Sequence, residues 1–199
     1  RFGEPIALSE RVPVLENLGF RAIDERSYHL KPRFADAVVD VTLHDMVLER
    51  ADGEPIELAG HDSRLEGCFL AVFRGEADND GFNRLILSAG ADWREVAAVR
   101  AYCAYLRQLE SPFGLRYLAD TLHRHAGLTR DLIELFHLRF DPGRALTQAE
   151  RQAAAEPIRQ RIEGALAKVP SLDEDRILRQ VFNLVVATTA RNPDTAPNV

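Results

Sequence analysis

The stretch from residue 70 to residue 109 constrains the fold most strongly, because its apolar side chains recur with the period of an α-helix. Two apolar stripes lie along it, and polar residues with a glycine separate them. Each stripe is typical of an amphipathic helix that buries one face. We therefore expect short helices that pack on a common core. The first stripe is Phe82, Leu85, Ile86 and Ala89, and the second is Val96, Val99, Cys103 and Leu106.

The residues between the stripes favour the end of one helix and the start of the next. Gly90 suits the left-handed position that ends a helix, and Asp92 with Glu95 three residues later forms a capping-box pattern. Asp78 and Asp80 precede the first stripe, where their oxygens can accept hydrogen bonds from free backbone N–H groups. The sequence therefore predicts a helix boundary at Gly90.

The sequence after residue 110 predicts helices only. Ser111-Pro112 and Thr129 each suit the start of a helix, and Thr147 and Ser171 begin further capping boxes. Pro157 has no N–H to donate, and proline is favoured in the first turn of a helix. We therefore expect a break before Pro157 in preference to one kinked helix.

The first 70 residues have a mixed pattern. We expect the end of a strand at residues 1–6, a helix at 9–18, strands at 20–30 and 38–48, and a helix whose capping box starts at Ser63. In the second strand Val39, Val41 and Leu43 alternate with polar residues, as in a half-buried strand. This order of elements is the beginning of a ferredoxin-like arrangement.

The segment AVFRGEADNDGFNRL at residues 71–85 resembles the large bacterial NAD-specific glutamate dehydrogenases. The match continues through the helix at 93–108 and through SLDEDRILR at 171–179, and with a weaker N-terminal part it covers nearly the whole chain. In that family this region precedes the catalytic domain and contains an ACT-like module, a small fold that many amino-acid-regulated enzymes use for sensing or assembly. The resemblance implies that the chain is a fragment of a longer enzyme.

Pattern and resemblance together predict an α+β chain with two regions. Residues 1–77 are expected to form a small ACT-like, ferredoxin-like α/β sandwich that lacks the beginning of its first strand, since the sequence starts with Arg1 and not with a methionine. Residues 78–192 are expected to form an all-α helical array. The polar tail 193–199 contains two prolines, and we expect it to be disordered.

The composition argues against several classes of protein. The net charge of −6 disfavours a nucleic-acid-binding surface. No apolar run approaches the roughly 18–20 residues of a membrane span. Cys68 and Cys103 both lie on apolar helical faces, so we interpret them as buried thiols in a reducing cytoplasm. We expect a cytoplasmic protein whose partners include neither nucleic acid nor membrane.

The residues that glutamate dehydrogenase chemistry requires are missing from the sequence. The resembled enzymes need lysines within a glycine-rich segment, whereas the only lysines, Lys31 and Lys168, lie in HLKPR and LAKVP. No GxGxxG or GxxxxGK[ST] loop occurs. We therefore expect no catalytic residue, cofactor or metal in this chain, while the resemblance implies NAD for the parent enzyme.

Other polar patterns have structural explanations. The run EADNDG at 76–81 is similar to the start of a calcium loop, but Leu87 stands where a bidentate acid is required, so we interpret it as helix capping. His123 and His125 point to different sides of a helix and do not suggest a zinc site. Interleaved acids favour a salt-bridged surface or interdomain contacts for six arginines, Arg100, Arg107, Arg116, Arg124, Arg130 and Arg139.

The loop before the first helix is the one candidate binding site. In related sensing modules this loop carries a glycine that lets the backbone approach an amino acid. Here Gly3, Glu4 and Ile6 are the candidate effector contacts, but Ala7 stands where a second glycine would help. We favour a structural use of the module over effector binding.

The sequence therefore predicts a non-catalytic regulatory or assembly segment of an NAD-specific glutamate dehydrogenase, an enzyme of amino-acid catabolism. The implied parent reaction oxidises L-glutamate with NAD to 2-oxoglutarate, ammonium and NADH. The implied partners are the rest of the parent chain, including its catalytic domain, and further copies in a homo-oligomer. Two alternatives stay open: an amino-acid-sensing allosteric module and a stand-alone helical interaction protein.

Overall fold

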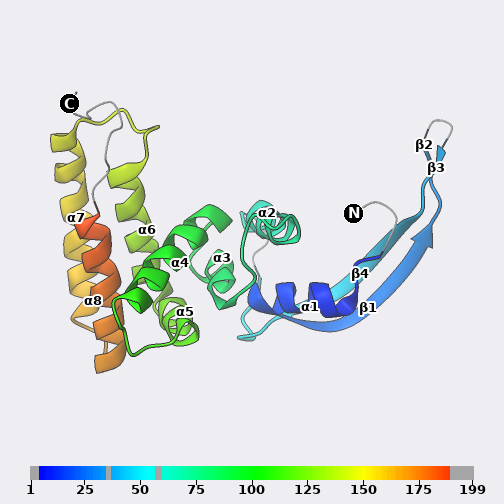
Figure 1. Cartoon of the computed structure of the whole chain (residues 1–199), viewed down its shortest axis with the longest axis horizontal. Helices are drawn as coiled ribbons and strands as arrows, with labels where there is room; N and C mark the ends of the chain where they lie inside the picture. Colours follow the sequence, from blue (N-terminus) through cyan, green and yellow to red (C-terminus); the bar gives the residue numbers. More distant parts are fainter. Residues whose placement is uncertain (1–4, 35–36, 57–59, 189–199) are drawn as a thin grey trace.

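A computed structural model describes residues 5–34, 37–56 and 60–188 (Figure 1). The chain is α+β, with two long strands and a helix at its N-terminal end and an all-helical array after them. The tail expected from residue 193 lies outside the described residues, as does most of the strand end expected at residues 1–6. Pro5 and Ile6 are described and are not in a strand.

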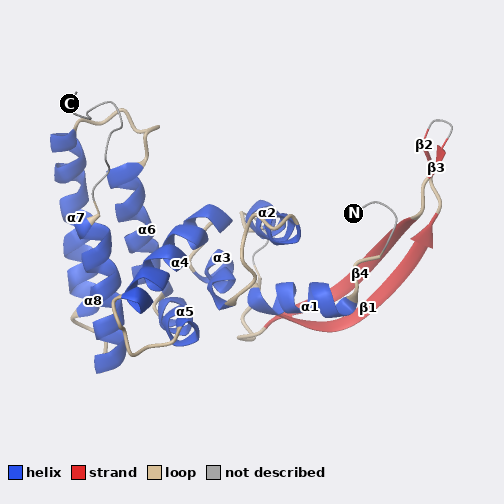
Figure 2. Ribbon diagram, viewed as in Figure 1, coloured by secondary structure: helices blue, strands red, loops and turns tan. Residues whose placement is uncertain are grey.

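The strands form a long antiparallel ribbon beside helix α1 (Leu8–Asn17). Strand β1 (Phe20–Leu30) pairs with β4 (Val41–Arg50), and the short β2 (Arg33–Phe34) and β3 (Ala37–Val38) lie at the far end of the hairpin. Figure 2 shows this ribbon curving away from the helices. Both predicted strands are therefore confirmed, the second with its bounds shifted towards Arg50.

The alternation in β4 is correctly predicted, but the face expected to be buried is exposed. Val41 and Leu43 are 37% and 52% exposed, whereas Met46 and Leu48 on the other face pack against the core. The alternation of apolar and polar residues shows only that the strand has two different faces. Which face is covered depends on α1, which lies on the side of Met46 and Leu48.

The helices of the array follow in short succession and match most of the predicted segments. The first apolar stripe is buried, in a 3₁₀ turn that continues into a one-turn helix. The elements are α2 (Asp62–Phe73), η1 (Gly81–Arg84), α3 (Leu85–Ser88), α4 (Trp93–Gln108), α5 (Leu115–Arg124), α6 (Ala126–Phe140), α7 (Gln148–Leu166) and α8 (Leu172–Ala187).

The predicted boundary between the two stripes is confirmed in detail. Gly90 has a φ of +60°, in the left-handed region. The Asp92 carboxylate accepts hydrogen bonds from the backbone N–H groups of Arg94 and Glu95, and the Glu95 carboxylate accepts from the Asp92 N–H, each at 2.8 Å. This capping box fixes the start of α4.

Three predicted helix starts are wrong. Helix α2 starts at Asp62 without a side-chain cap, so the predicted capping box at Ser63 does not form. Helix α5 starts at Leu115 and not at Pro112. Helix α6 starts at Ala126, and Thr129 lies inside it and donates to the Leu122 carbonyl at 2.8 Å. A buried threonine can satisfy its hydroxyl in this way instead of capping a helix.

The break expected at Pro157 does not occur, because α7 is one helix from Gln148 to Leu166. Ala155, Ile158, Ile162 and Leu166 are all buried along it. A break would misalign this apolar stripe on both sides of the proline. Packing therefore outweighs the local cost of the missing hydrogen bond.

One apolar cluster connects the N-terminal helix with the array. Val14 of α1 and Leu18, directly after this helix, belong to it together with Phe82, Leu85 and Ile177. The division of the chain at residue 77 stays a prediction. Among the described residues, no helix is both long and apolar enough to cross a membrane.

Candidate functional site

The ribbon exposes an apolar face, which we call the outer face and define as Tyr28, Leu30, Val41, Leu43 and Val47. These side chains are between 37% and 55% exposed. Tyr28 lies opposite Leu43, and Leu30 lies opposite Val41, so these four residues are contiguous across the two strands. Val47 lies on the same face beyond Asp45. Contiguous exposed apolar patches are characteristic of interaction sites.

The opposite face of the ribbon holds a charged network beneath α1. Arg11, only 5% exposed, forms an ion pair with Glu25 and donates to the Ile6 carbonyl at 2.9 Å. The Glu25 carboxylate also contacts the Ser27 hydroxyl at 2.9 Å and His44 Nδ1 at 3.1 Å. These contacts fix α1 to both strands.

The same network determines the acidity of Glu25. Burial raises the pKa of this carboxyl, but hydrogen bonds from Ser27 and Arg11, the charge of Arg11 and the contact with His44 together hold it below its usual value. Three buried atoms of the network have no hydrogen-bond partner in the described part of the chain: Arg11 Nε, Glu25 Oε2 and His44 Nε2.

The predicted effector loop is only partly described. Gly3 and Glu4 lie outside the described residues, so nothing tests their role. Ile6 is half-buried, and its carbonyl contacts Arg11. Arg11, Glu25 and His44 were not predicted to form a network, because Arg11 reaches Glu25 and His44 only through the packing of α1 on the strands.

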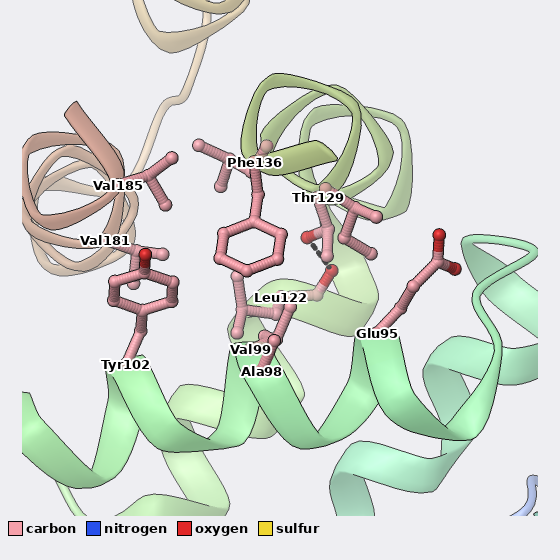
Figure 3. A pocket seen from close by; sticks show the side chains of 11 residues that line it. Glu95, Ala98, Val99, Tyr102, Leu122, Thr129, Phe136, Val181 and Val185 are labelled. Atoms are coloured by element: carbon pink, nitrogen blue, oxygen red, sulfur yellow. Dashed lines mark hydrogen bonds between the residues drawn. The ribbon is translucent and has the colours of Figure 1, made fainter. Parts of the chain in front are cut away.

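The enclosed space inside the array is small and apolar. Its volume is about 20 Å³, room for roughly one water molecule, between α4, α6 and α8. Figure 3 shows the rings of Tyr102 and Phe136 pointing into this space, while Glu95 lies to one side. The Glu95 carboxylate pairs with His137 Nε2 at 2.7 Å. This cavity is a gap in the packing and offers no polar group arranged for a ligand.

A larger hollow of about 630 Å³ lies where α6, α7 and the end of α8 meet. Three arginines line it, but two of them already donate hydrogen bonds to backbone carbonyls. Arg139 donates to the carbonyls of Val185, Val186 and Thr188, and Arg151 donates to four carbonyls around the end of α6. Their charges stabilise helix C-termini and are not free for an anion.

Three of the six arginines singled out in the sequence pair with acids, as predicted, whereas Arg107 and Arg139 donate to backbone carbonyls. Arg100 binds Asp80, Arg124 binds Glu174 and Arg130 binds Glu95. Asp80 caps the 3₁₀ turn by accepting from the Phe82 N–H at 3.0 Å, which confirms helix capping for this run. Within the described ranges, no three His, Cys, Asp or Glu side chains are grouped to hold a metal.

Glu174 connects the end of α5 to the start of α8. It accepts from His125 Nε2 at 2.7 Å and from Arg124 Nε at 2.9 Å. The hydrogen bond from His125, with those from Arg124 and their charges, holds the pKa of Glu174 below its ordinary 4.5 despite the opposing effect of burial. A carboxyl of lowered pKa contributes stability above its unfolded-state pKa and loses it as the pH falls through the folded-state value.

Glu174→Gln is therefore expected to lower stability at pH 7 and to make the remaining stability less sensitive to acid. The measurement is urea unfolding at pH 7 and at about pH 3, where the wild type loses the contribution of Glu174 and the variant has none to lose. Glu66→Gln, at an exposed carboxyl on α2, is the matched control. Equal acid sensitivity in wild type and Glu174→Gln would contradict the prediction.

Known proteins match nearly the whole chain. Residues 1–61 match the family model described as glutamate dehydrogenase, ACT3 domain, and residues 77–142 match glutamate dehydrogenase, helical motif 3. The NAD-specific glutamate dehydrogenase of Halomonas elongata is 41% identical over 192 residues, which is 96% of this chain and 11% of that enzyme.

Two other relatives also match nearly the whole chain. The enzymes of the same name from Pseudomonas aeruginosa and Mycobacterium tuberculosis are 38% and 29% identical over 94% and 96% of this chain. The chain spans only 11–12% of the length of these relatives. It therefore belongs to the large NAD-specific glutamate dehydrogenase family, as a region that carries the ACT3 domain and helical motif 3.

Proposed function

We propose that the chain is a non-catalytic assembly segment of an NAD-specific glutamate dehydrogenase. The whole enzyme would oxidise L-glutamate with NAD, and this segment would hold parts of the enzyme together. The relatives are NAD-specific glutamate dehydrogenases, and the small share of their length that the chain spans supports this role. The proposed partners are the rest of the enzyme chain, including its catalytic domain, and further copies through a homo-oligomer.

The observation that carries the proposal is the outer face of the ribbon. Five large apolar side chains are exposed on this one face, whereas Met46 and Leu48 on the other face of β4 pack against the core. Covering a Val or Leu side chain contributes about 1.5–3 kcal/mol. Exposing such a face to water is unfavourable in free energy. Docking another part of the enzyme on it would remove this unfavourable exposure.

Replacing both Leu43 and Val47 by lysine is expected to weaken this docking by about 3 kcal/mol, a hundredfold or more in the equilibrium. In the complete enzyme, light scattering should show incomplete assembly, and glutamate-dependent reduction of NAD should fall with it. The isolated chain should keep its melting temperature, because both side chains are already exposed.

Leu172→Lys is the matched control, because Leu172 is 83% exposed on α8 and lies outside the outer face. It should assemble as the wild type does. Normal assembly of the Leu43 and Val47 double variant would refute docking through the outer face.

A second candidate function, amino-acid sensing, is supported by the three unpartnered atoms of the network under α1. Arg11 Nε can donate to a carboxylate, and Glu25 Oε2 can accept from an ammonium group, which are the two charged ends of an amino acid. A sensing module should show a higher melting temperature with one of the twenty amino acids, and Glu25→Gln should abolish the shift. No shift with any amino acid would exclude this function.

A further inference from the structure

His123 lies on α5, near the place where the base of the ribbon meets the helical array. Its side chain is half-buried, and its Nδ1 atom is buried with no hydrogen-bond partner in the described part of the chain. A neutral imidazole tolerates this, because Nδ1 carries no proton when Nε2 does. A protonated imidazole would hold an N–H there that nothing accepts, which is unfavourable. The neutral form therefore fits the folded chain better.

Arg84 of the 3₁₀ turn connects the ribbon base with α5 beside this histidine. A Cβ atom on Gly19, in the turn between α1 and β1, would lie 3.5 Å from Cγ of Arg84. The same arginine forms an ion pair with Asp120 of α5. Asp120 and His123 are three residues apart in the helix and therefore lie on one side of it. The ribbon base, the 3₁₀ turn and this side of α5 thus form one contact.

The ribbon brings a second ion pair to the same contact. Arg50, the last residue of β4, pairs with Asp52 in the turn that follows. The Ala51 N–H between them donates to the Gly19 carbonyl at 2.8 Å, which closes the base of the ribbon. Both charges of this pair act on His123. The histidine therefore has one ion pair of the ribbon and one of the array near it.

Most other charges on the elements packed against α5 are already paired. Helix α3 has no ionisable side chain. On α8, Glu174 binds Arg124 and His125 of the α5 end. On α4 and α6 the pairs are Arg100 with Asp80, Glu95 with His137 and Arg130, and Asp131 and Glu134 with Arg161 of α7.

The surroundings hold the pKa of His123 below its usual 6.5. Burial of the imidazole is the largest cause, the positive charge of Arg84 is the next, and Arg50 acts in the same direction. Asp52 and Asp120 oppose them, but each of these carboxylates is paired with an arginine. A protonated imidazole would therefore be a third positive charge beside two guanidinium groups.

We propose that His123 makes the contact between the ribbon base and α5 sensitive to pH, so that the contact is closed in neutral solution and opens in mild acid. In the open contact the imidazole reaches water, binds a proton and moves away from the two arginines. The ribbon, which carries the outer face, then gains freedom to move relative to the array. The inference concerns a contact inside the described residues and does not depend on the proposed function.

Proton linkage gives the direction of the effect. The histidine has the higher pKa in the open contact, so the open state binds more protons and falling pH favours it. The effect begins near pH 6.5, the usual value for histidine, and one proton changes the opening equilibrium by at most about tenfold per pH unit. Above about pH 7.5 the histidine is neutral in both states, and the contact should not respond to pH.

The distance between two spin labels, measured by pulsed electron paramagnetic resonance, tests the inference on the 199-residue chain. Val38→Cys and Leu172→Cys place one label near the far end of the ribbon and one on α8, and both positions are exposed. The native Cys68 and Cys103 are fully buried and should stay unlabelled. At about pH 7.5 one narrow distance distribution is expected. At about pH 5.5 a second, broader population should be several-fold larger.

His123→Gln, added to the labelled chain, cannot gain a charge, so its distance distribution should be the same at both pH values. Its melting temperature at about pH 7.5 shows whether it folds. His29→Gln is the matched control, because His29 is exposed on the ribbon away from its base. The control should open in acid as the labelled parent chain does.

Three results would overturn the inference. A distance distribution that does not change with pH in the parent chain would show that the contact does not open. Equal opening in His123→Gln would show that another group is responsible. The third result comes from nuclear magnetic resonance of the unmodified chain and needs no variant: proton uptake by His123 at the same or a higher pH than in the urea-unfolded chain would show that the closed contact does not favour the neutral imidazole.

Discussion

Leu85→Asp is expected to unfold the helical array. Leu85 is fully buried in α3, between the 3₁₀ turn and α4, and belongs to the common apolar cluster. A carboxylate placed there has no partner and must be desolvated, which costs several kcal/mol. Because a domain of this size is stable by only about 5–15 kcal/mol, much of the total would be lost.

Circular dichroism during thermal unfolding measures the effect. Leu172→Asp is the control, because Leu172 is 83% exposed in the first turn of α8, where a negative charge suits the helix dipole. It should change the stability by about 0.5 kcal/mol or less. A melting temperature of Leu85→Asp equal to that of the wild type would mean that the first apolar stripe does not form the core.

The helical array was predictable because its signals are local. The stripes, Gly90 and the capping pair Asp92 and Glu95 each act within a few residues, and the structure uses each of them. The wrong predictions concern positions where tertiary contacts determine the local structure. The Thr129 hydroxyl donates a hydrogen bond to the Leu122 carbonyl of the preceding helix. Pro157 stays within a continuous helix because its neighbours are buried.

The candidate site was less predictable, because it depends on what covers each face of the ribbon. The alternation of β4 indicates two faces, and apolar residues occur on both. The position of α1 determines that Met46 and Leu48 are covered and that Leu43 and Val47 are exposed. A single sequence contains no local signal for that choice, because it results from packing between distant segments.

Arg100→Met is expected to destabilise the chain by about 3 kcal/mol. The Arg100 guanidinium is 11% exposed and binds Asp80 through Nε at 2.8 Å and through Nη2 at 3.0 Å. It also donates to the buried Asn83 side chain at 2.8 Å. Removing the guanidinium leaves the buried Asn83 side chain without a partner and Asp80, which is 38% exposed, without its counter-charge, which is why the loss exceeds the worth of a surface pair.

Arg179→Met is the matched control, because Arg179 pairs with Asp175 on an exposed side of α8 and such pairs contribute about 0.5 kcal/mol. Urea unfolding at neutral pH compares the two variants with the wild type. The larger loss in Arg100→Met should be recovered in part by adding Asp80→Asn, since the second change removes the unpaired charge. If the single and double variants lost equal stability, the ion pair would not be what fixes the start of the helical array.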